Sequence, residues 1–456
     1  MNNLVRITGI DISKPARALA WLRLTGYALV VLCGSVAIGL LSDLVITFPS
    51  RDAETLVLEL IASLILGFVA YTGWRHAAVI DPTGWKSYRV VLMLLVIFCL
   101  FVIAWDRLTT SRSDANTRAQ EPGRNQTASF EAVWIGSVAL LGWILLVRLR
   151  RMDITGMGAT VDQVLFRLSK NAGVTALQAI EIRRINKPRG LVLGTAGVLL
   201  LLAGGIARIE TGLTGLGFLL LIFARQDFQV DANSLLAADR RSPILFLRSF
   251  ADDETQIYHA SAKAFLDFSL EARLYYHFSR FGPFVAIGAS NETTPMVGAA
   301  RMLLSDDEWQ QRVLSLIRDA KLIIMYSGTT HWVNWELRQV VKNECATRLI
   351  LMMPEIRALL WALKEEISAR VEQVREGFCG TPWEQELLSF KDFARLRAML
   401  FRPDGSMVMV KSRSKSRDSY HLAALVAHHI LIDSDAPNNA GTIRPGPSLD
   451  STGRTI

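Results

Sequence analysis

Long apolar segments dominate the first half of the chain. About 20 residues of helix cross the hydrocarbon core of a bilayer, and uncharged runs of that length are rare in the cores of soluble proteins. We therefore predict an α-helical polytopic membrane region, in which the last segment is short and either spans fully or re-enters. The apolar segments are Leu24–Phe48, Thr55–Trp74, Val90–Trp105 and Ala132–Val147, followed by a pair at Gly190–Ala207 and Gly212–Ala224.

The pattern changes at Pro243 to short apolar runs that alternate with amphipathic helices, which is typical of an α/β domain with a parallel sheet. The predicted strands are 244–250, 284–287, 322–326, 348–353 and 406–410. The predicted helices are 264–280, one that begins at Ser305, 331–343, 356–378, 383–401 and 419–432. From Asp433 the chain is rich in Pro, Gly, Asn, Ser and Thr, which predicts a disordered tail.

These patterns divide the chain into five parts. We expect a four-helix transmembrane region at 1–150, an amphipathic linker at 151–189 and a transmembrane hairpin at 190–225. The α/β domain follows at 242–432, and the tail occupies 433–456. Apolar residues at helical spacing within the linker predict a helix that lies against the inner leaflet or connects the spans.

Composition supports a membrane half joined to a soluble half. The chain is 51% hydrophobic and only 20% charged, with a mean hydropathy of +0.28, which is more apolar than an ordinary soluble chain. Its net charge of +8 lies entirely in residues 1–224, because residues 225–456 carry 28 basic and 28 acidic residues. A neutral soluble domain argues against nucleic acid as a partner.

The basic residues of the first half also predict orientation. With the N-terminus inside, 16 Lys and Arg fall in the inner loops and six in the outer loops, as the positive-inside rule requires. We therefore expect a multi-pass protein of the cell inner (plasma) membrane, with both termini in the cytoplasm. The four cysteines form no C-x-x-C pair, and we predict no metal site and no disulfide framework.

Polar residues follow three of the predicted strands. In a parallel α/β sheet, ligands bind outside the carboxyl ends of the strands, where the strand order reverses. The candidate ligand-binding residues there are Arg248, Ser249, Asp252, Asp253, Gly288, Arg301, Ser327 and Trp332.

Several of these residues have two interpretations. Arg301 either pairs with a phosphate or forms a salt bridge with Asp306 or Asp307. The acids at 252 and 253 contact a ligand or cap the next helix, and Arg248 holds a phosphate or pairs with Glu336.

Two short motifs fall at these strand ends. The segment 246–253 reads FLRSFADD, an apolar strand that ends in Ser-Phe with an acid shortly after. The segment 326–337 begins Tyr-Ser and then contains Trp332, Glu336 and Leu337 in the spacing Trp-x-x-x-Glu-Leu. Together they resemble the first box and the third-strand region of Toll/interleukin-1 receptor (TIR) domains. The resemblance covers residues 243–354 and implies a flavodoxin-like (TIR-like) fold; nucleoside deoxyribosyltransferase-like domains share this architecture.

The resemblance also implies an activity. Catalytic TIR domains cleave the nicotinamide–ribose bond of NAD with the Glu of Trp-x-x-x-Glu, a role that falls here to Glu336. A carboxylate stabilises the oxocarbenium-like state through which such a bond breaks. NAD or a related nucleotide would then be a substrate, with no bound cofactor. The alternative is that Glu336 complements the helix dipole and that the neighbouring Trp residues pack.

Three functions follow from these observations. The first is a membrane-anchored TIR-like signalling or effector protein that cleaves the N-glycosidic bond of NAD or a related nucleotide. The second is a non-catalytic TIR-like module that self-associates or binds a nucleotide and is coupled to a membrane sensor. The third is a gated channel or transporter, which the lack of charged pairs deep in the spans disfavours.

Overall fold

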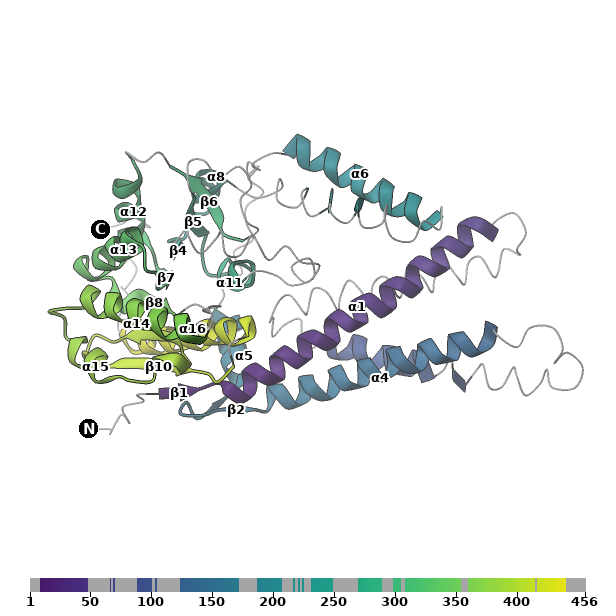
Figure 1. Cartoon of the computed structure of the whole chain (residues 1–456), viewed down its shortest axis with the longest axis horizontal. Helices are drawn as coiled ribbons and strands as arrows, with labels where there is room; N and C mark the ends of the chain where they lie inside the picture. Colours follow the sequence, from purple (N-terminus) through teal and green to yellow (C-terminus); the bar gives the residue numbers. More distant parts are fainter. Residues whose placement is uncertain are drawn as a thin grey trace, which may run out of the picture.

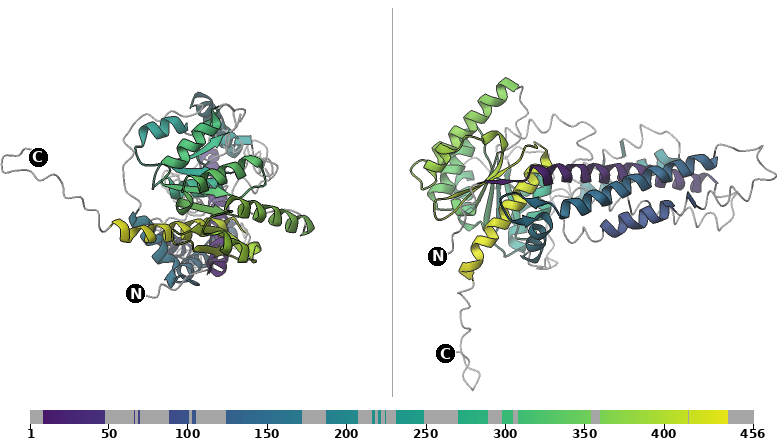
Figure 2. Two further views of the ribbon diagram at one scale, coloured as in Figure 1. Left: turned by 90° about the vertical axis from the view of Figure 1, so that its left-hand side faces the viewer. Right: turned by 90° about the horizontal axis from the view of Figure 1, so that it is seen from below.

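The computed structural model describes an α/β domain from which long helices extend. It describes residues 9–47, 66, 69, 88–100, 103–104, 124–171, 187–206, 216–217, 220–221, 224, 231–248, 270–288, 298–304, 308–353, 360–414 and 416–439. Helices α1 (Ser13–Thr47) and α4 (Arg124–Arg150) run side by side away from the sheet (Figures 1 and 2). Helix α6 (Lys187–Ile206) extends from the same side.

The α/β domain is built on one eight-stranded sheet in the order β1-β10-β9-β8-β7-β4-β5-β6. Strands β6, β5, β4, β7 and β8 run parallel to one another, β9 is antiparallel to both β8 and β10, and β1 is parallel to β10. The bounds are β1 (Gly9–Asp11), β4 (Ile244–Leu247), β5 (Phe284–Gly288), β6 (Ala300–Leu303), β7 (Leu322–Tyr326), β8 (Leu349–Met352), β9 (Leu396–Phe401) and β10 (Met407–Lys411). The α/β class is confirmed, but the sheet is mixed rather than parallel.

Two strands that the pattern did not predict change the order of the sheet. Strand β6 adds an edge beyond β5, so the five parallel strands have the order 3-2-1-4-5, which corresponds to the first five positions of the doubly wound order 3-2-1-4-5-6 rather than to the flavodoxin-like 2-1-3-4-5. Strand β9 lies where we predicted the end of a helix at 383–401, of which α15 (Glu384–Ser389) is α-helical and Phe393–Arg395 forms a short 3-10 turn. The predicted last strand, β10, is therefore not adjacent to β8.

Each face of the sheet buries its own core. Because side chains alternate along a strand, Phe246 and Ile324 point to one face and Leu245 and Ile323 to the other. The first face, here the α16 face, is covered by α11 (Leu270–Phe278) and α16 (Arg417–Asn439). The opposite face, here the α13 face, is covered by α8 (Ala232–Ala238), α12 (Trp309–Asp319), α13 (His331–Lys342), α14 (Leu360–Gly377) and α15.

Apart from the helix predicted at 383–401, the predicted helices of the domain form within the described residues with small shifts at their ends. Helix α12 begins at Trp309, and the predicted cap Ser305 lies outside the described residues. Helix α16 continues to Asn439, so the tail that we expected from Asp433 begins in a helix. The segment 440–456 lies outside the described residues.

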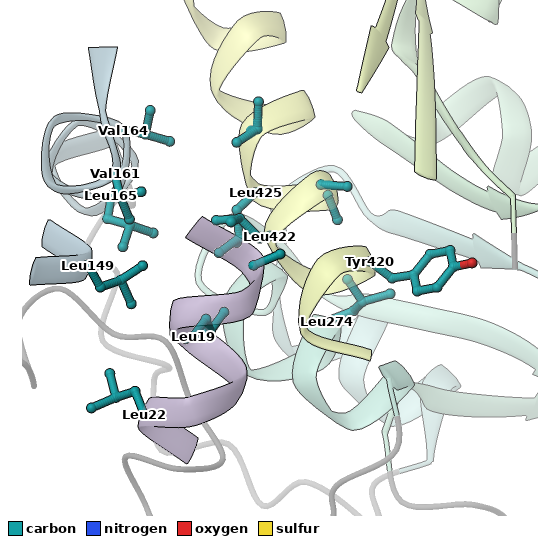
Figure 3. Close-up of a cluster of buried hydrophobic side chains, with 14 of the residues drawn as sticks. Leu19, Leu22, Leu149, Val161, Val164, Leu165, Leu274, Tyr420, Leu422 and Leu425 are labelled. Atoms are coloured by element: carbon teal, nitrogen blue, oxygen red, sulfur yellow. The ribbon is translucent and has the colours of Figure 1, made fainter. Parts of the chain in front are cut away.

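Residues 9–22 belong to the α/β domain. Strand β1 joins the sheet beside β10, and α1 begins two residues later with Ile12, Leu19 and Leu22 buried in the core of the α16 face. Figure 3 shows Leu19 beside Leu422 and Leu425 of α16. The first turns of α1 therefore pack in the core of the α16 face.

The amphipathic helix of the linker is also part of this junction. Helix α5 (Val161–Asn171) buries its apolar stripe, Val161, Val164, Leu165 and Leu168, and contacts α16 (Figure 3). We had expected this stripe to lie against the inner leaflet or to connect the spans. Because it packs inside the protein, it does not face a leaflet. A two-stranded ribbon, β2 (Asp153–Ile154) with β3 (Ala159–Thr160), leads from α4 into α5.

Two described helices are long and apolar enough to cross a membrane, at Ser13–Cys33 and Ala132–Arg150. The apolar helices at Tyr88–Leu100 and Pro188–Leu200 are shorter. Most of the predicted segments 55–74 and 212–224 lies outside the described residues. The polytopic region with six segments therefore stays a prediction.

Candidate functional site

The strand order places the expected ligand edge at the carboxyl ends of β4 and β7. Strand β4 has β5 on one side and β7 on the other, and the chain order reverses at β4. Ligands of such sheets bind in the crevice at that point. Arg248 directly follows β4 and Ser327 directly follows β7, so both stand at this edge.

A buried ionic cluster lies at this edge on the α16 face. The Oε2 atom of Glu271, in the first turn of α11, is 3.3 Å from Nε of Arg248 and 3.0 Å from Nη2 of Arg301. The Oε1 atom of the same carboxylate accepts a hydrogen bond from the backbone N–H of Ala299. All three charged side chains are at most 5% exposed. The structure therefore brings two of the predicted residues together around a third that we did not predict.

The register of the strands explains how the cluster forms. Arg301 of β6 pairs with Ala286 of β5, and Ala286 pairs with Phe246 of β4. Because side chains alternate, Arg301 and Arg248 point to the same face as Phe246. Gly298 allows Glu271 to approach, since a Cβ atom there would lie 2.6 Å from its Cγ atom.

Three buried polar atoms at this place have no hydrogen-bond partner among the residues that the structure describes. They are Nε and Nη1 of Arg301 and the hydroxyl oxygen of Tyr326, the last residue of β7. Burial raises the pKa of Tyr326 well above its usual value of 10, and the charge of Glu271 adds to that shift. The Tyr326 ring packs edge-on against Phe246, which fixes it on the α16 face.

Glu336 lies on the other side of the sheet. It belongs to the buried stripe of α13, with Val333, Leu337 and Val340, and these apolar neighbours are part of the core of the α13 face. Glu336 is 5% exposed, its Oε2 atom has no hydrogen-bond partner within the described part of the chain, and burial raises its pKa to about 8. The carboxyl is therefore protonated at neutral pH.

This placement corrects one of the predicted pairings. Arg248 pairs with Glu271 and not with Glu336, because the sheet lies between the two faces. Arg301 also pairs with Glu271, and the acids at 306 and 307 lie outside the described residues.

Two other predicted ligand-binding residues, Ser327 and Gly288, make contacts within the fold. The hydroxyl of Ser327 donates to Sδ of Met353 at 3.1 Å, and its carbonyl accepts a hydrogen bond from Arg370. Gly288 ends β5 with its neighbour Leu303 in register. Ser327 and Glu336 therefore share the α13 face, while Gly288 lies one strand further from the reversal.

Trp332 and Glu336 do not face a common space. The indole of Trp332 is 51% exposed and packs edge-on against Trp309, with ring centroids 5.0 Å apart. Trp335 also packs on Trp309. The i, i+4 spacing thus places one side chain at the surface and the other in the core. Ser249, Asp252 and Asp253 lie outside the described residues.

A second buried ionic cluster connects α1 with the domain. The Oδ1 atom of Asp418, in the first turn of α16, lies 2.6 Å from Nε of Arg23 in α1 and 3.0 Å from Nη1 of Arg273 in α11. Nη2 of Arg23 also donates to Nδ1 of His421 at 2.9 Å. Burial and the two arginines hold the pKa of His421 well below 6.5, so that ring is neutral.

Sequence reasoning missed Glu271, Tyr326, Asp418 and Arg23 as interacting residues. The only signal for Glu271 was an acid next to apolar positions of a predicted helix, which does not reveal its partner. Comparisons with protein-family models, with curated proteins and with solved structures give no match.

Proposed function

We propose that the protein is a membrane-anchored signalling or effector protein whose α/β domain lies in the cytoplasm and takes a nucleotide as ligand or substrate. The observation that carries this proposal is the continuity of α1. One uninterrupted helix of 35 residues begins at the edge of the sheet, passes the ionic cluster at Arg23 and continues beyond the domain. At about 1.5 Å per residue, it is roughly 50 Å long.

The exposed side chains of the extending helices support a lipid environment. Beyond the domain, Leu24 and Val31 of α1 are each 55% exposed. Trp134, Leu140 and Ile144 of α4 are 54%, 46% and 47% exposed. Soluble monomers rarely expose contiguous apolar surface on this scale. A bilayer around these helices would cover it.

Basic residues at the end of α4 support a cytoplasmic position for the domain. Arg148 and Arg150 lie in the last turn of α4, and Arg151 follows it. Arg150 pairs with Asp162 of α5, which contacts α16. The positive-inside rule places this end, and with it the α/β domain, on the cytoplasmic side.

Cysteine labelling tests the proposal. Cys379 is exposed on the α/β domain, whereas Cys33, Cys99 and Cys345 are buried. With the three buried cysteines replaced by alanine, a membrane-impermeant maleimide should label Cys379 in inverted membrane vesicles and not in spheroplasts. A matched variant with Ser111→Cys, in a predicted outer loop, should give the opposite result. Recovery of the chain in the supernatant after carbonate extraction would refute the proposal.

Cleavage of NAD is a second candidate function, favoured by one observation. Glu336 follows the carboxyl end of β7 and keeps a buried carboxyl with an unpartnered oxygen and a pKa of about 8. Strongly perturbed carboxyls are concentrated at functional sites. In the reaction, water replaces nicotinamide on the ribose and releases one proton, giving ADP-ribose. A carboxylate that stabilises the oxocarbenium-like state must be ionised.

The buried, protonated state of Glu336 therefore implies that activity requires a rearrangement. Self-association that brings water to the carboxyl would lower its pKa and ionise it. We expect the full chain in nanodiscs, at concentrations that drive self-association, to release nicotinamide from NAD. Glu336→Gln should abolish release, and Glu376→Gln, at a residue 55% exposed on α14, should not. Intact NAD with the assembled wild-type chain would exclude this function.

A further inference from the structure

We infer that the outer face of α5 is a docking surface for anionic lipid headgroups of the inner leaflet, with Phe166 inserted among them. This outer face carries Phe166, Arg167 and Lys170, and it lies opposite the buried stripe that packs against α16. The inference deepens the proposed function, because it names the lipid chemistry that positions the α/β domain. It rests on that function, since α1 and α4 must cross the membrane.

The first observation is the exposed ring of Phe166. The apolar stripe of α5 is buried, whereas Phe166 on the outer face is 62% exposed. A single exposed apolar residue is ordinary by itself. Here, however, the ring lies one turn before the exposed Lys170 on the same face. Aromatic and basic side chains together are typical of helices that lie in the interface of a membrane.

The second observation is the level of α5 along the extending helices. A Cβ atom at Gly142 would lie 3.2 Å from Oγ1 of Thr25 and 3.6 Å from Cδ1 of Leu92, so these three residues share one level. Helix α4 ends eight residues later at Arg150, about 12 Å nearer the α/β domain. Arg150 pairs with Asp162 of α5 at 2.8 and 3.0 Å, so α5 begins at the level where α4 ends.

The third observation is the change in exposed side chains between these two levels. Near the first level, Leu24 is 55% exposed and Ile144 is 47% exposed. Nearer the domain, the exposed side chains Arg148 and Arg151 are basic, and so is Arg89 at the start of the neighbouring helix. Such a change is expected where the hydrocarbon core meets the headgroups of the inner leaflet. Helix α5 therefore begins beside the headgroup layer.

The charge of the junction selects an anionic lipid. Residues 148–171 contain five Lys and Arg and two Asp, which leaves an excess of three positive charges. One of the two acids, Asp162, is paired with Arg150. Each Lys or Arg within a Debye length of an anionic leaflet strengthens binding about fivefold, whereas a zwitterionic leaflet supplies no such attraction.

An environment-sensitive dye at position 166 tests the inference in the full chain. Phe166→Cys, with the four native cysteines replaced by alanine, is labelled with nitrobenzoxadiazole. The labelled chain is placed in nanodiscs of phosphatidylcholine, or of phosphatidylcholine mixed with anionic phosphatidylglycerol. We expect the emission to shift to the blue with the anionic lipid and to shift back in about 1 M salt. Leu388→Cys is the matched control, because Leu388 is 55% exposed on α15 at the end of the domain away from the long helices (Figure 1). A dye there should not respond to the lipid.

Charge variants of the labelled chain test the basic residues. Arg151→Gln combined with Lys170→Gln should lower the equilibrium constant for insertion about 25-fold, measured over a series of phosphatidylglycerol fractions. Arg338→Gln combined with Lys342→Gln removes the same charge from exposed positions of α13. This control should leave the equilibrium constant unchanged.

The unmodified chain gives a second measurement, which decides the question if the cysteine-free variants do not fold. A water-soluble acetylating reagent modifies exposed lysines, and mass spectrometry follows the rate at each position. Lys170 should react about fivefold more slowly in anionic nanodiscs than in zwitterionic ones. Lys342, which is exposed on α13, should react at the same rate in both.

Two results would overturn the inference. One is a dye emission and a Lys170 acetylation rate that are the same in both lipid compositions. The other is an equal effect of the two pairs of charge variants. Carbonate extraction of the same chains separates these results from failure of the proposed function. A chain that stays in the membrane but whose α5 does not respond to anionic lipid refutes the docking surface alone.

Discussion

Replacement of Glu336 by glutamine should stabilise the protein at neutral and alkaline pH. The carboxyl is buried among apolar residues of α13, and burial alone raises its pKa from 4.5 to about 8. In the unfolded chain the same group ionises near 4.5. Each unit of difference corresponds to about 1.4 kcal/mol, so retaining the proton in the folded state costs roughly 4 kcal/mol at pH 8.

The sign of the effect follows from the protons bound in each state. Below pH 4.5 both states hold the proton and the carboxyl contributes its full stability. As pH rises toward 8, the unfolded state gains stability by ionising while the folded state does not. The wild-type chain should therefore lose stability relative to Glu336→Gln across this window, and the difference should level off above it.

Urea unfolding followed by tryptophan fluorescence at several pH values measures this difference. We expect the two chains to be close in stability near pH 5 and to differ by roughly 3–4 kcal/mol at pH 8. Glu376→Gln is the control, because that side chain is 55% exposed and its variant should follow the wild type at every pH. Parallel pH profiles for wild type and Glu336→Gln would refute the reasoning.

Two further predictions concern buried contacts. Asp418→Asn should reduce the free energy of unfolding by about 3–5 kcal/mol, because it removes the buried carboxylate that Arg23 and Arg273 both contact. Asp162→Asn removes a carboxylate that is 41% exposed, so it should reduce the free energy of unfolding by at most about 1 kcal/mol. Equal losses for the Asp418 and Asp162 variants in urea unfolding would contradict this difference. Gly298→Ala should displace Glu271 and reduce the free energy of unfolding by about 1–3 kcal/mol, which thermal unfolding measures. An unchanged midpoint temperature would show that the backbone at position 298 moves to make room for the methyl group.

The parts of the fold that the sequence predicts well are those in which local pattern and burial agree. Strand β7 is a continuous apolar run because both of its faces are covered, and α13 follows it with a threonine cap at 330. Both elements form where we expected them. The edge that carries Arg248 and Ser327 was predictable for the same reason, since it follows from the ends of two such strands.

The errors have a different physical origin. Strand β9 has the sequence LRAMLF, whose Leu, Arg, Ala and Met favour helix in isolation, and only its place between β8 and β10 makes it a strand. Strand β6 is four residues long and contains Arg301, so it lacks an apolar run. The pairing of Arg301 with Glu271 joins residues 30 positions apart, and no local pattern encodes it.

Helix α11 carries both ionic clusters on residues that are two positions apart. Glu271 reaches the arginines at the sheet edge, and Arg273 reaches Asp418, which in turn holds Arg23 of α1. A shift of α11 relative to the sheet would therefore disturb the ion pairs at the sheet edge and those at α1 together. Because linkage is reciprocal, a change at the sheet edge that moves α1 implies that a displacement of α1 changes the sheet edge by the same coupling free energy. Helix α11 thus joins two distant parts of the fold through two neighbouring charged side chains.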